Sequence, residues 1–137
     1  MAETNAELVK SLYAAVAKGD PGTLFAAFDP QIVWNEAEGF AYAQGNPYVG
    51  PQRIAEGIFG RLMTEWDGFT VAPKQVIAEG ETVVATGRYG GTFKATGARL
   101  DAQFVHVWTI RGGKVTSFQQ YTDTLQFARV MEQGAGV

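Results

Sequence analysis

The chain has 137 residues, 46% of them hydrophobic and 18% charged, with a formal net charge of −3, a composition typical of one globular domain with its own core. It has no cysteine and one histidine, which excludes disulfides, thiolate nucleophiles and Cys- or His-rich metal sites. Its eleven basic residues are scattered, which argues against a nucleic-acid surface.

The N-terminal segment MAETNAELVK is polar and acidic, and no long apolar run follows it. Neither a signal peptide nor a membrane span is therefore expected. The simplest expectation is a cytoplasmic protein with no membrane partner, in which residues 1–137 form a single domain.

Two helices are expected at the start of the chain. Apolar residues at helical spacing predict the first over residues 6–18, with Thr4 or Asn5 as its N-cap. The pair Asp20-Pro21 is typical of a cap followed by a first helical residue, and it predicts a second short helix over residues 21–28.

A strand, a loop and a third helix should follow. Residues 31–36 predict a short strand with Trp34 and Glu36 on one face, because alternate side chains share a face. Residues 37–50 are rich in glycine and aromatic side chains and predict a long loop, a feature that often serves function in compact domains. Residues 52–66 predict the third helix.

The second half of the chain predicts an antiparallel meander. Its four strands cover residues 69–78, 82–93, 99–110 and 115–121. A short last helix is expected over residues 123–133. Helices that are separate from antiparallel strands indicate an α+β fold, and a strongly curved sheet would leave an open concave side.

Four segments are distinctive in their order and spacing. They are LYAAVAKGD at 12–20, VW at 33–34, YVGPQRI at 48–54 and HVWTIRGGKVTSFQQYTDT at 106–124. Together they resemble the SnoaL-like branch of the NTF2-like superfamily, which also contains ketosteroid isomerases, polyketide cyclases and limonene epoxide hydrolases. The resemblance implies an α+β cone, in which a curved mixed or antiparallel sheet wraps around about three helices and a mostly apolar pocket. It also implies a homodimer through the outer sheet face, and no metal or organic cofactor.

The same resemblance implies candidate catalytic residues. The base of the isomerases, an aspartate on the strand after the second helix, aligns with Asn35, which cannot take a proton, and Glu36 lies beside it. His106 falls near the isomerases' protonated aspartate, and a neutral imidazole can also donate to an enolate. In the SnoaL-type cyclases an asparagine and a histidine–aspartate pair serve the substrate, and Asn35, His106 and Asp123 resemble that set.

Each candidate also has a structural interpretation that the sequence leaves open. His106 would equally suit a core position where neighbouring groups satisfy its ring, and Glu36 a solvated position at the rim. Asp123 begins the sequence DTLQ and suits a helix N-cap. Tyr13 matches the helix-1 tyrosine of the isomerases with an offset of one residue, a rotation of about 100° that would turn it from the pocket.

Aromatic side chains are expected to line the pocket, although aromatic residues in small domains are often simply core. The candidate ligand-binding residues are Trp34, Trp108, Tyr42, Tyr48, Phe59, Met63, Tyr89, Phe118, Gln120 and Tyr13. The expected function is to bind an apolar small molecule, with proton abstraction next to a carbonyl if the protein is an isomerase or cyclase. The alternative is a non-catalytic ligand-binding or dimerisation module.

Overall fold

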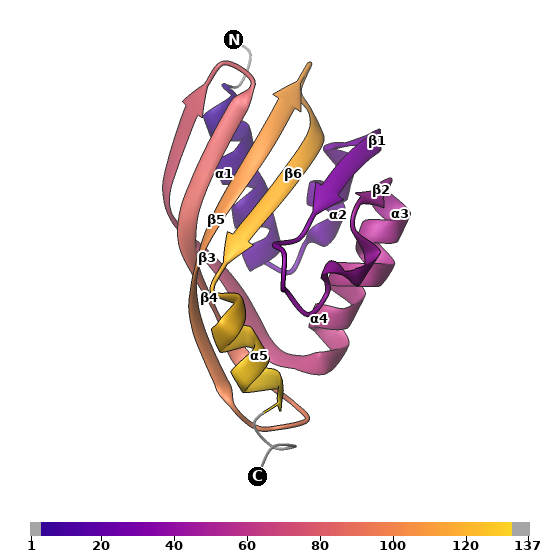
Figure 1. The fold of residues 1–137 in the computed structure, drawn as a ribbon. Helices are drawn as coiled ribbons and strands as arrows, with labels where there is room; N and C mark the ends of the chain where they lie inside the picture. Colours follow the sequence, from indigo (N-terminus) through magenta and orange to yellow (C-terminus); the bar gives the residue numbers. More distant parts are fainter. Residues whose placement is uncertain (1–3, 133–137) are drawn as a thin grey trace.

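A curved six-stranded sheet forms the frame of the molecule, and helices pack against its concave face (Figure 1). The computed structural model describes residues 4–132. The strand order is β2-β1-β6-β5-β4-β3, with β1 and β6 parallel and the other neighbours antiparallel. The strands are β1 (Phe28–Asn35), β2 (Tyr48–Val49), β3 (Trp66–Glu79), β4 (Thr82–Phe93), β5 (Arg99–Arg111) and β6 (Lys114–Thr122). The predicted α+β fold with a curved mixed sheet is confirmed.

The two N-terminal helices begin as the sequence predicts. Thr4 caps α1 (Asn5–Ala17) in a capping box, because its hydroxyl accepts from the backbone N–H of Glu7 while the Glu7 carboxylate accepts from the N–H of Thr4. Asp20 caps α2 (Pro21–Ala26). This helix is shorter than predicted, because the chain is already extended in β1 from Phe28 onward.

The predicted third helix is continuous but changes its winding. It consists of α3 (Pro51–Ile54), a π-helical segment η2 (Ala55–Phe59) and α4 (Gly60–Glu65). Gly57 lies in the π-helical segment, where a Cβ would overlap the ring of Tyr48. A glycine at this position therefore allows the loop before the helix to pack directly on it.

The loop at residues 37–50 is more ordered than the sequence suggests. It contains a 3₁₀ turn, η1 (Ala43–Gly45), and the short strand β2, which pairs with β1 through Tyr48 and Val49. The edge of the sheet is thereby extended over the end of β1.

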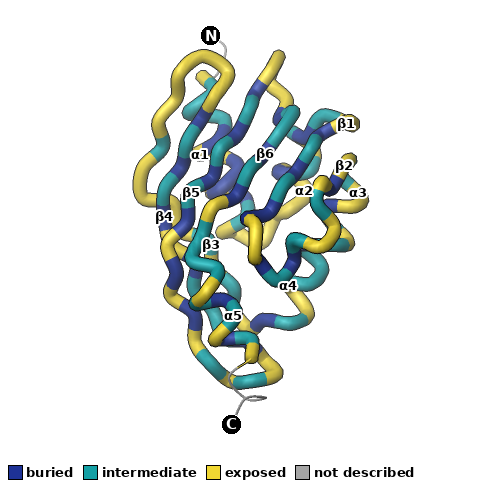
Figure 2. Tube along the Cα trace, viewed as in Figure 1, coloured by how far each residue is buried: buried dark blue, intermediate teal, exposed yellow. Residues whose placement is uncertain are grey.

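The expected alternation along β5 is confirmed. His106 and its alternate neighbours are buried, whereas Val105, Val107 and Thr109, which point to the other face, are half-buried. Figure 2 shows the alternation of buried and half-buried positions along β5. The last helix, α5 (Thr124–Glu132), packs on β5 at one end of the sheet. Within residues 4–132 no helix has the length and apolar character that a membrane crossing requires.

Candidate functional site

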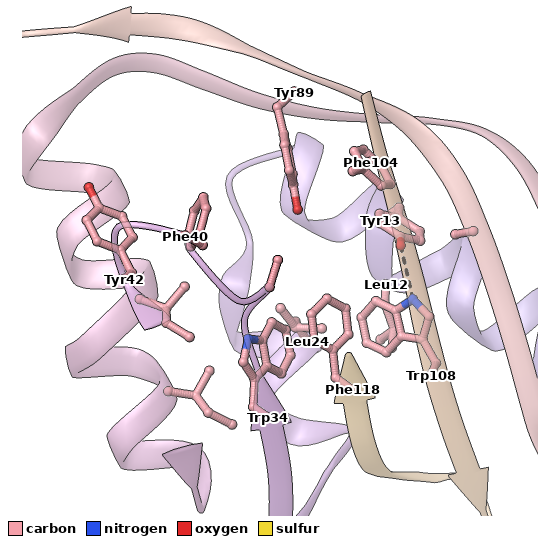
Figure 3. Close-up of a cluster of buried hydrophobic side chains, with 14 of the residues drawn as sticks. Leu12, Tyr13, Leu24, Trp34, Phe40, Tyr42, Tyr89, Phe104, Trp108 and Phe118 are labelled. Carbon is pink, nitrogen blue, oxygen red and sulfur yellow. Dashed lines mark hydrogen bonds between the residues drawn. The ribbon is translucent and has the colours of Figure 1, made fainter. Parts of the chain in front are cut away.

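A cavity of about 60 Å³ lies between the concave face of the sheet and the helices. Aromatic and aliphatic side chains form nearly all of its wall. Ten of the sequence candidates line it, namely Tyr13, Trp34, Glu36, Tyr42, Phe59, Tyr89, His106, Trp108, Phe118 and Gln120. Figure 3 shows several of these rings converging from α1, β1, β5 and β6.

His106 is held between two tyrosine hydroxyls. Its Nδ1 is 2.6 Å from the hydroxyl of Tyr13, and its Nε2 is 2.5 Å from the hydroxyl of Tyr89. The indole N–H of Trp108 also donates to the Tyr13 hydroxyl, at 3.0 Å (Figure 3). Burial lowers the pKa of His106 to about 3, so the ring is neutral at physiological pH.

Gln120 connects this group to the chain beyond β1. Its Oε1 accepts from the backbone N–H of Ala37 at 3.1 Å, and its Nε2 donates to the hydroxyl of Tyr89 at 3.0 Å. Because a backbone N–H can only donate, the first bond determines which end of the amide faces Tyr89.

Glu36 is a buried carboxyl without a cationic partner. Its side chain is 3% exposed and forms no ion pair within residues 4–132. The indole N–H of Trp34 donates to its Oε1 at 2.5 Å. Burial raises the pKa of Glu36 to about 7, and the bond from Trp34 lowers it in part. The carboxyl is therefore poised to accept or release a proton near neutral pH.

Asn46 holds the main chain of Glu36 in place. Its Oδ1 accepts from the N–H of Glu36 at 2.9 Å, and its Nδ2 donates to the carbonyl of Glu36 at 2.8 Å. The interpretation of Glu36 as a solvated rim residue is therefore wrong. The loop folds back over the end of β1 and buries the carboxyl.

Tyr13 lies in the cavity, as its place among the candidate ligand-binding residues requires, and the offset of one residue does not turn it away. Asn35 does not lie there. It pairs with Gln119 on β6 and lines a separate surface cleft, because the alternation that directs Trp34 and Glu36 inward directs Asn35 outward. The expectation that Asn35 orients a ligand in the central pocket is corrected by this placement.

Asp123 is the N-cap of α5 and does not line the cavity. Its Oδ1 accepts from the backbone N–H of Gln126 at 3.0 Å. A pairing with His106 of the kind known in the cyclases is absent from the hydrogen bonds that His106 makes in the described chain. The helix-cap interpretation, which the sequence also allowed, is confirmed.

Two of the expected lining residues are placed elsewhere. Tyr48 is buried, but its ring fills the space between Gly45 and Gly57, and its hydroxyl donates to the backbone carbonyl of Tyr42. Met63 is 73% exposed on α4 and does not line the cavity. Both are corrections to the predicted ligand-binding set.

The sequence analysis missed eight lining residues. They are Leu12, Val16, Leu24, Phe40, Ile58, Leu62, Phe69 and Val71. Helical spacing of four residues within α1 and within the third helix could have indicated some of them, and alternation at the start of β3 could have indicated others.

The lining residues that remain partly exposed come from the end of α1, from the segment 59–62 and from the start of β3, so the mouth of the cavity lies between these elements.

Tyr42 connects the loop to the third helix beside this mouth. Its hydroxyl donates to Glu65 at 2.6 Å and accepts from the indole N–H of Trp66 at 3.0 Å. The guanidinium carbon of Arg61 lies 3.9 Å from the centre of the Tyr42 ring, and Arg61 also pairs with Glu65. These contacts hold the aromatic part of the loop against the cavity.

Within residues 4–132 no group of three or more acidic or histidine side chains is arranged to hold a metal ion. The polar groups of the otherwise apolar cavity are one carboxyl and a hydrogen-bonded set of hydroxyl, imidazole and amide groups.

The profile of the SnoaL-like domain matches residues 9–118 of the chain. An NTF2-like protein from Burkholderia thailandensis has 37% sequence identity and a TM-score of 0.90, with 95% of this chain and 98% of that chain covered. An NTF2-like protein of unknown function from Burkholderia pseudomallei has 25% identity, a TM-score of 0.84 and coverage of 94% and 98%. TerC, co-crystallised with polyporic acid, has 28% identity, a TM-score of 0.81 and coverage of 93% and 98%. None of the curated proteins matches the chain significantly.

Proposed function

Because the chain belongs to the SnoaL-like domain family of the NTF2-like superfamily, we propose that its cavity binds a small apolar molecule with a carbonyl group, and that Glu36 removes the proton next to this carbonyl. The observation that carries the proposal is the buried, unpaired carboxyl of Glu36 in an apolar cavity. Burial raises its pKa to about 7, the range in which a general base works best at neutral pH.

The proposed reaction needs only groups of this chain. The carboxylate of Glu36 takes the C–H proton, and the electron pair of that bond moves to the carbonyl oxygen to form an enolate. A tyrosine hydroxyl in the cavity donates a hydrogen bond to this oxygen. The protonated Glu36 then returns the proton to a different carbon in an isomerisation. In an aldol cyclisation the enolate carbon attacks a second carbonyl, and the proton goes to the new alkoxide.

The size of the cavity restricts the substrate. Its volume of about 60 Å³ is less than half of the roughly 150 Å³ that accommodates benzene in an engineered cavity. A ligand with one ring therefore requires the side chains at the mouth, or the loop that carries Phe40 and Tyr42, to move. The similarity to TerC, which was co-crystallised with polyporic acid, supports a ligand that combines rings with carbonyl groups.

Deuterium exchange tests the proposal without knowledge of the natural substrate. Cyclopentenone, cyclohexenone and larger cyclic enones are incubated with the protein in D₂O, and NMR measures deuterium gained next to the carbonyl. We expect exchange with at least one ketone, reduced by 100-fold or more in Glu36→Gln, the low end of what general base catalysis contributes. Glu38→Gln, which changes an exposed carboxylate two residues away, should exchange normally. Equal exchange in wild type and Glu36→Gln would refute the role of Glu36.

A non-catalytic binding protein is the second candidate. The mutually bonded His106, Tyr13 and Tyr89 favour it, because hydrogen-bonded groups can serve structure alone. A thermal-shift titration with polyporic acid distinguishes the two functions. Binding without deuterium exchange on any ketone would favour the binding protein.

We also propose that the chain forms a homodimer through the convex face of the sheet. Val105, Val107 and Thr109 form an apolar strip there, and Tyr121 on β6 is 55% exposed. Apolar patches of this kind mark interaction surfaces. Sedimentation equilibrium should give the mass of a dimer for wild type and of a monomer for Val107→Lys. A monomeric wild type at high micromolar concentration would refute this assembly.

A further inference from the structure

The Tyr13–His106–Tyr89 group holds one more hydrogen than it has internal hydrogen bonds. Neutral His106 has one N–H, and each tyrosine has one O–H, whereas the group has two internal contacts. Trp108 and Gln120 both donate into the group, at Tyr13 and Tyr89, so neither can accept the third hydrogen. Neither hydroxyl has a further partner among the hydrogen bonds of residues 4–132. One hydroxyl hydrogen is therefore available to a molecule in the cavity.

The tautomer of His106 decides which hydroxyl this is. If Nε2 carries the proton, Nε2–H donates to Tyr89, Nδ1 accepts from Tyr13, and the O–H of Tyr89 is free. If Nδ1 carries the proton, every bond is reversed and the O–H of Tyr13 is free. In both cases one tyrosine donates to His106 and His106 donates to the other tyrosine, whose own O–H is free. Hydrogen bonds in such a chain polarise one another, which makes the free O–H a stronger donor.

Glu36 distinguishes the two arrangements. Glu36 and both tyrosines line the same cavity, but Gln120 joins the hydroxyl of Tyr89 to the backbone N–H of Ala37, the residue next to Glu36, whereas the hydroxyl of Tyr13 bonds to Trp108. In agreement with this placement, the charge of Glu36 raises the pKa of Tyr89. A carboxylate attracts the positive end of a nearby O–H dipole. The ionised Glu36 therefore favours the arrangement in which the Tyr89 hydroxyl points away from His106. Figure 3 shows that the oxygen of Tyr89 lies at the end of the ring that faces the aromatic cluster.

We propose that His106 is the Nε2–H tautomer, that Tyr89 is therefore the hydroxyl that donates to the carbonyl oxygen of the ligand, and that Tyr13 is a positioning residue that acts through His106. The part that concerns the ligand rests on the proposed function, whereas the tautomer is a property of the free protein. His106 itself does not meet the ligand oxygen, because both of its nitrogens are already bonded. This replaces the direct donor role that the sequence implied for His106.

Nitrogen NMR tests the tautomer directly, because the chain has one histidine and its signals need no assignment. A long-range ¹H–¹⁵N spectrum of the free protein at pH 8 should show a protonated Nε2 and an unprotonated Nδ1. In Tyr13→Phe the two nitrogen shifts should move toward each other, because the donor that holds Nδ1 unprotonated is lost. A protonated Nδ1 in the wild type would overturn the proposal.

Ligand affinity tests the donor. The dissociation constant of cyclohexenone is measured by chemical-shift titration for wild type, Tyr89→Phe and Tyr13→Phe, after circular dichroism has shown that all three are folded. We expect a loss of about tenfold in Tyr89→Phe, as for one hydrogen bond, and a smaller loss in Tyr13→Phe. An equal or larger loss in Tyr13→Phe would overturn the assignment to Tyr89. If cyclohexenone binds to none of the three proteins, the ligand of the proposed function is wrong, and the nitrogen spectrum still decides which hydroxyl is free.

Discussion

The indole N–H of Trp34 donates a hydrogen bond of 2.5 Å to the carboxyl of Glu36, two residues further along the chain. This bond stabilises the charged form of a carboxylate that burial strongly disfavours. The two effects oppose each other and leave the pKa of Glu36 at about 7. Trp34 thereby adjusts the proton affinity of the proposed base.

The stability of the protein should depend on the proton of Glu36. Its pKa rises from 4.5 in the unfolded chain to about 7 in the folded protein, so between these values the folded state keeps a proton that the unfolded state has lost. This contribution to stability is complete below pH 4.5 and falls as the pH rises to 7, by roughly 3 kcal/mol in total at 1.36 kcal/mol per pKa unit.

His106 changes stability with pH in the opposite direction. Its pKa falls from 6.5 in the unfolded chain to about 3 in the folded protein, so its contribution to stability grows as the pH rises from 3 to 6.5. The two slopes should nearly cancel between pH 4.5 and 6.5 in the wild type. In Glu36→Gln, urea unfolding should show stability that rises throughout this interval, whereas Glu38→Gln should behave as wild type. A flat profile in Glu36→Gln would contradict the raised pKa of Glu36.

Replacement of Trp34 by Phe should raise the pKa of Glu36 further. The substitution keeps an aromatic ring in the cavity but removes the N–H that stabilises the carboxylate. The pH at which ketone exchange reaches half its maximum should therefore move upward. Trp108→Phe serves as the control, because its N–H bonds to Tyr13 and not to Glu36. A midpoint that moves equally in both variants would indicate a general effect of repacking.

Substitution of Gly57 by Ala should destabilise the fold. The new methyl group would overlap the ring of Tyr48, and such overpacking costs about 1–3 kcal/mol. Alanine is otherwise the better helix former by about 1 kcal/mol. Gly22→Ala is the matched control, because the nearest atom to its Cβ would be 3.4 Å away and α2 should gain stability. Chemical denaturation compares the two, and a gain in stability in Gly57→Ala would show that the ring can move aside.

Tyr42→Phe should loosen the attachment of the loop to the third helix. It leaves the buried indole N–H of Trp66 without its partner and removes the bond to Glu65, which should cost about 1–3 kcal/mol. Amide hydrogen exchange should then increase in residues 37–50 and remain unchanged in β4 and β5. If the loop exchanges no faster than in the wild type, its order does not depend on Tyr42.

Much of the fold follows from local patterns in the sequence. Alternation correctly oriented His106, Trp108 and Glu36, and the caps at Thr4 and Asp20 correctly marked the starts of α1 and α2. These features depend on neighbours a few residues away. The mixed sheet, in which β1 pairs with β6 in parallel, is predicted from the family resemblance, because no local signal in the sequence indicates it.

The errors in the site come from contacts between distant segments. The burial of Glu36 depends on Asn46, whose side chain folds back onto its main chain, and no periodicity reveals such a contact. The place of Tyr13 depends on how α1 is rotated about its own axis, which its packing on the sheet decides. The sequence predicts Tyr48 at the ligand, because a glycine-rich loop offers few core contacts, but its ring packs in the space that Gly45 and Gly57 leave open.

The parallel pairing of β1 with β6 has a consequence for how the protein is made. Trp34 pairs in register with Phe118 on the neighbouring strand β6, which is synthesised about 80 residues after β1. On the ribosome, the cavity wall beside Glu36 is therefore incomplete until β5 and β6, which carry His106 and Gln120, have been synthesised. Such distant pairing slows folding. Nascent chains that end before β6 should thus bind no ligand, and the ability to bind should arise in the final stage of synthesis.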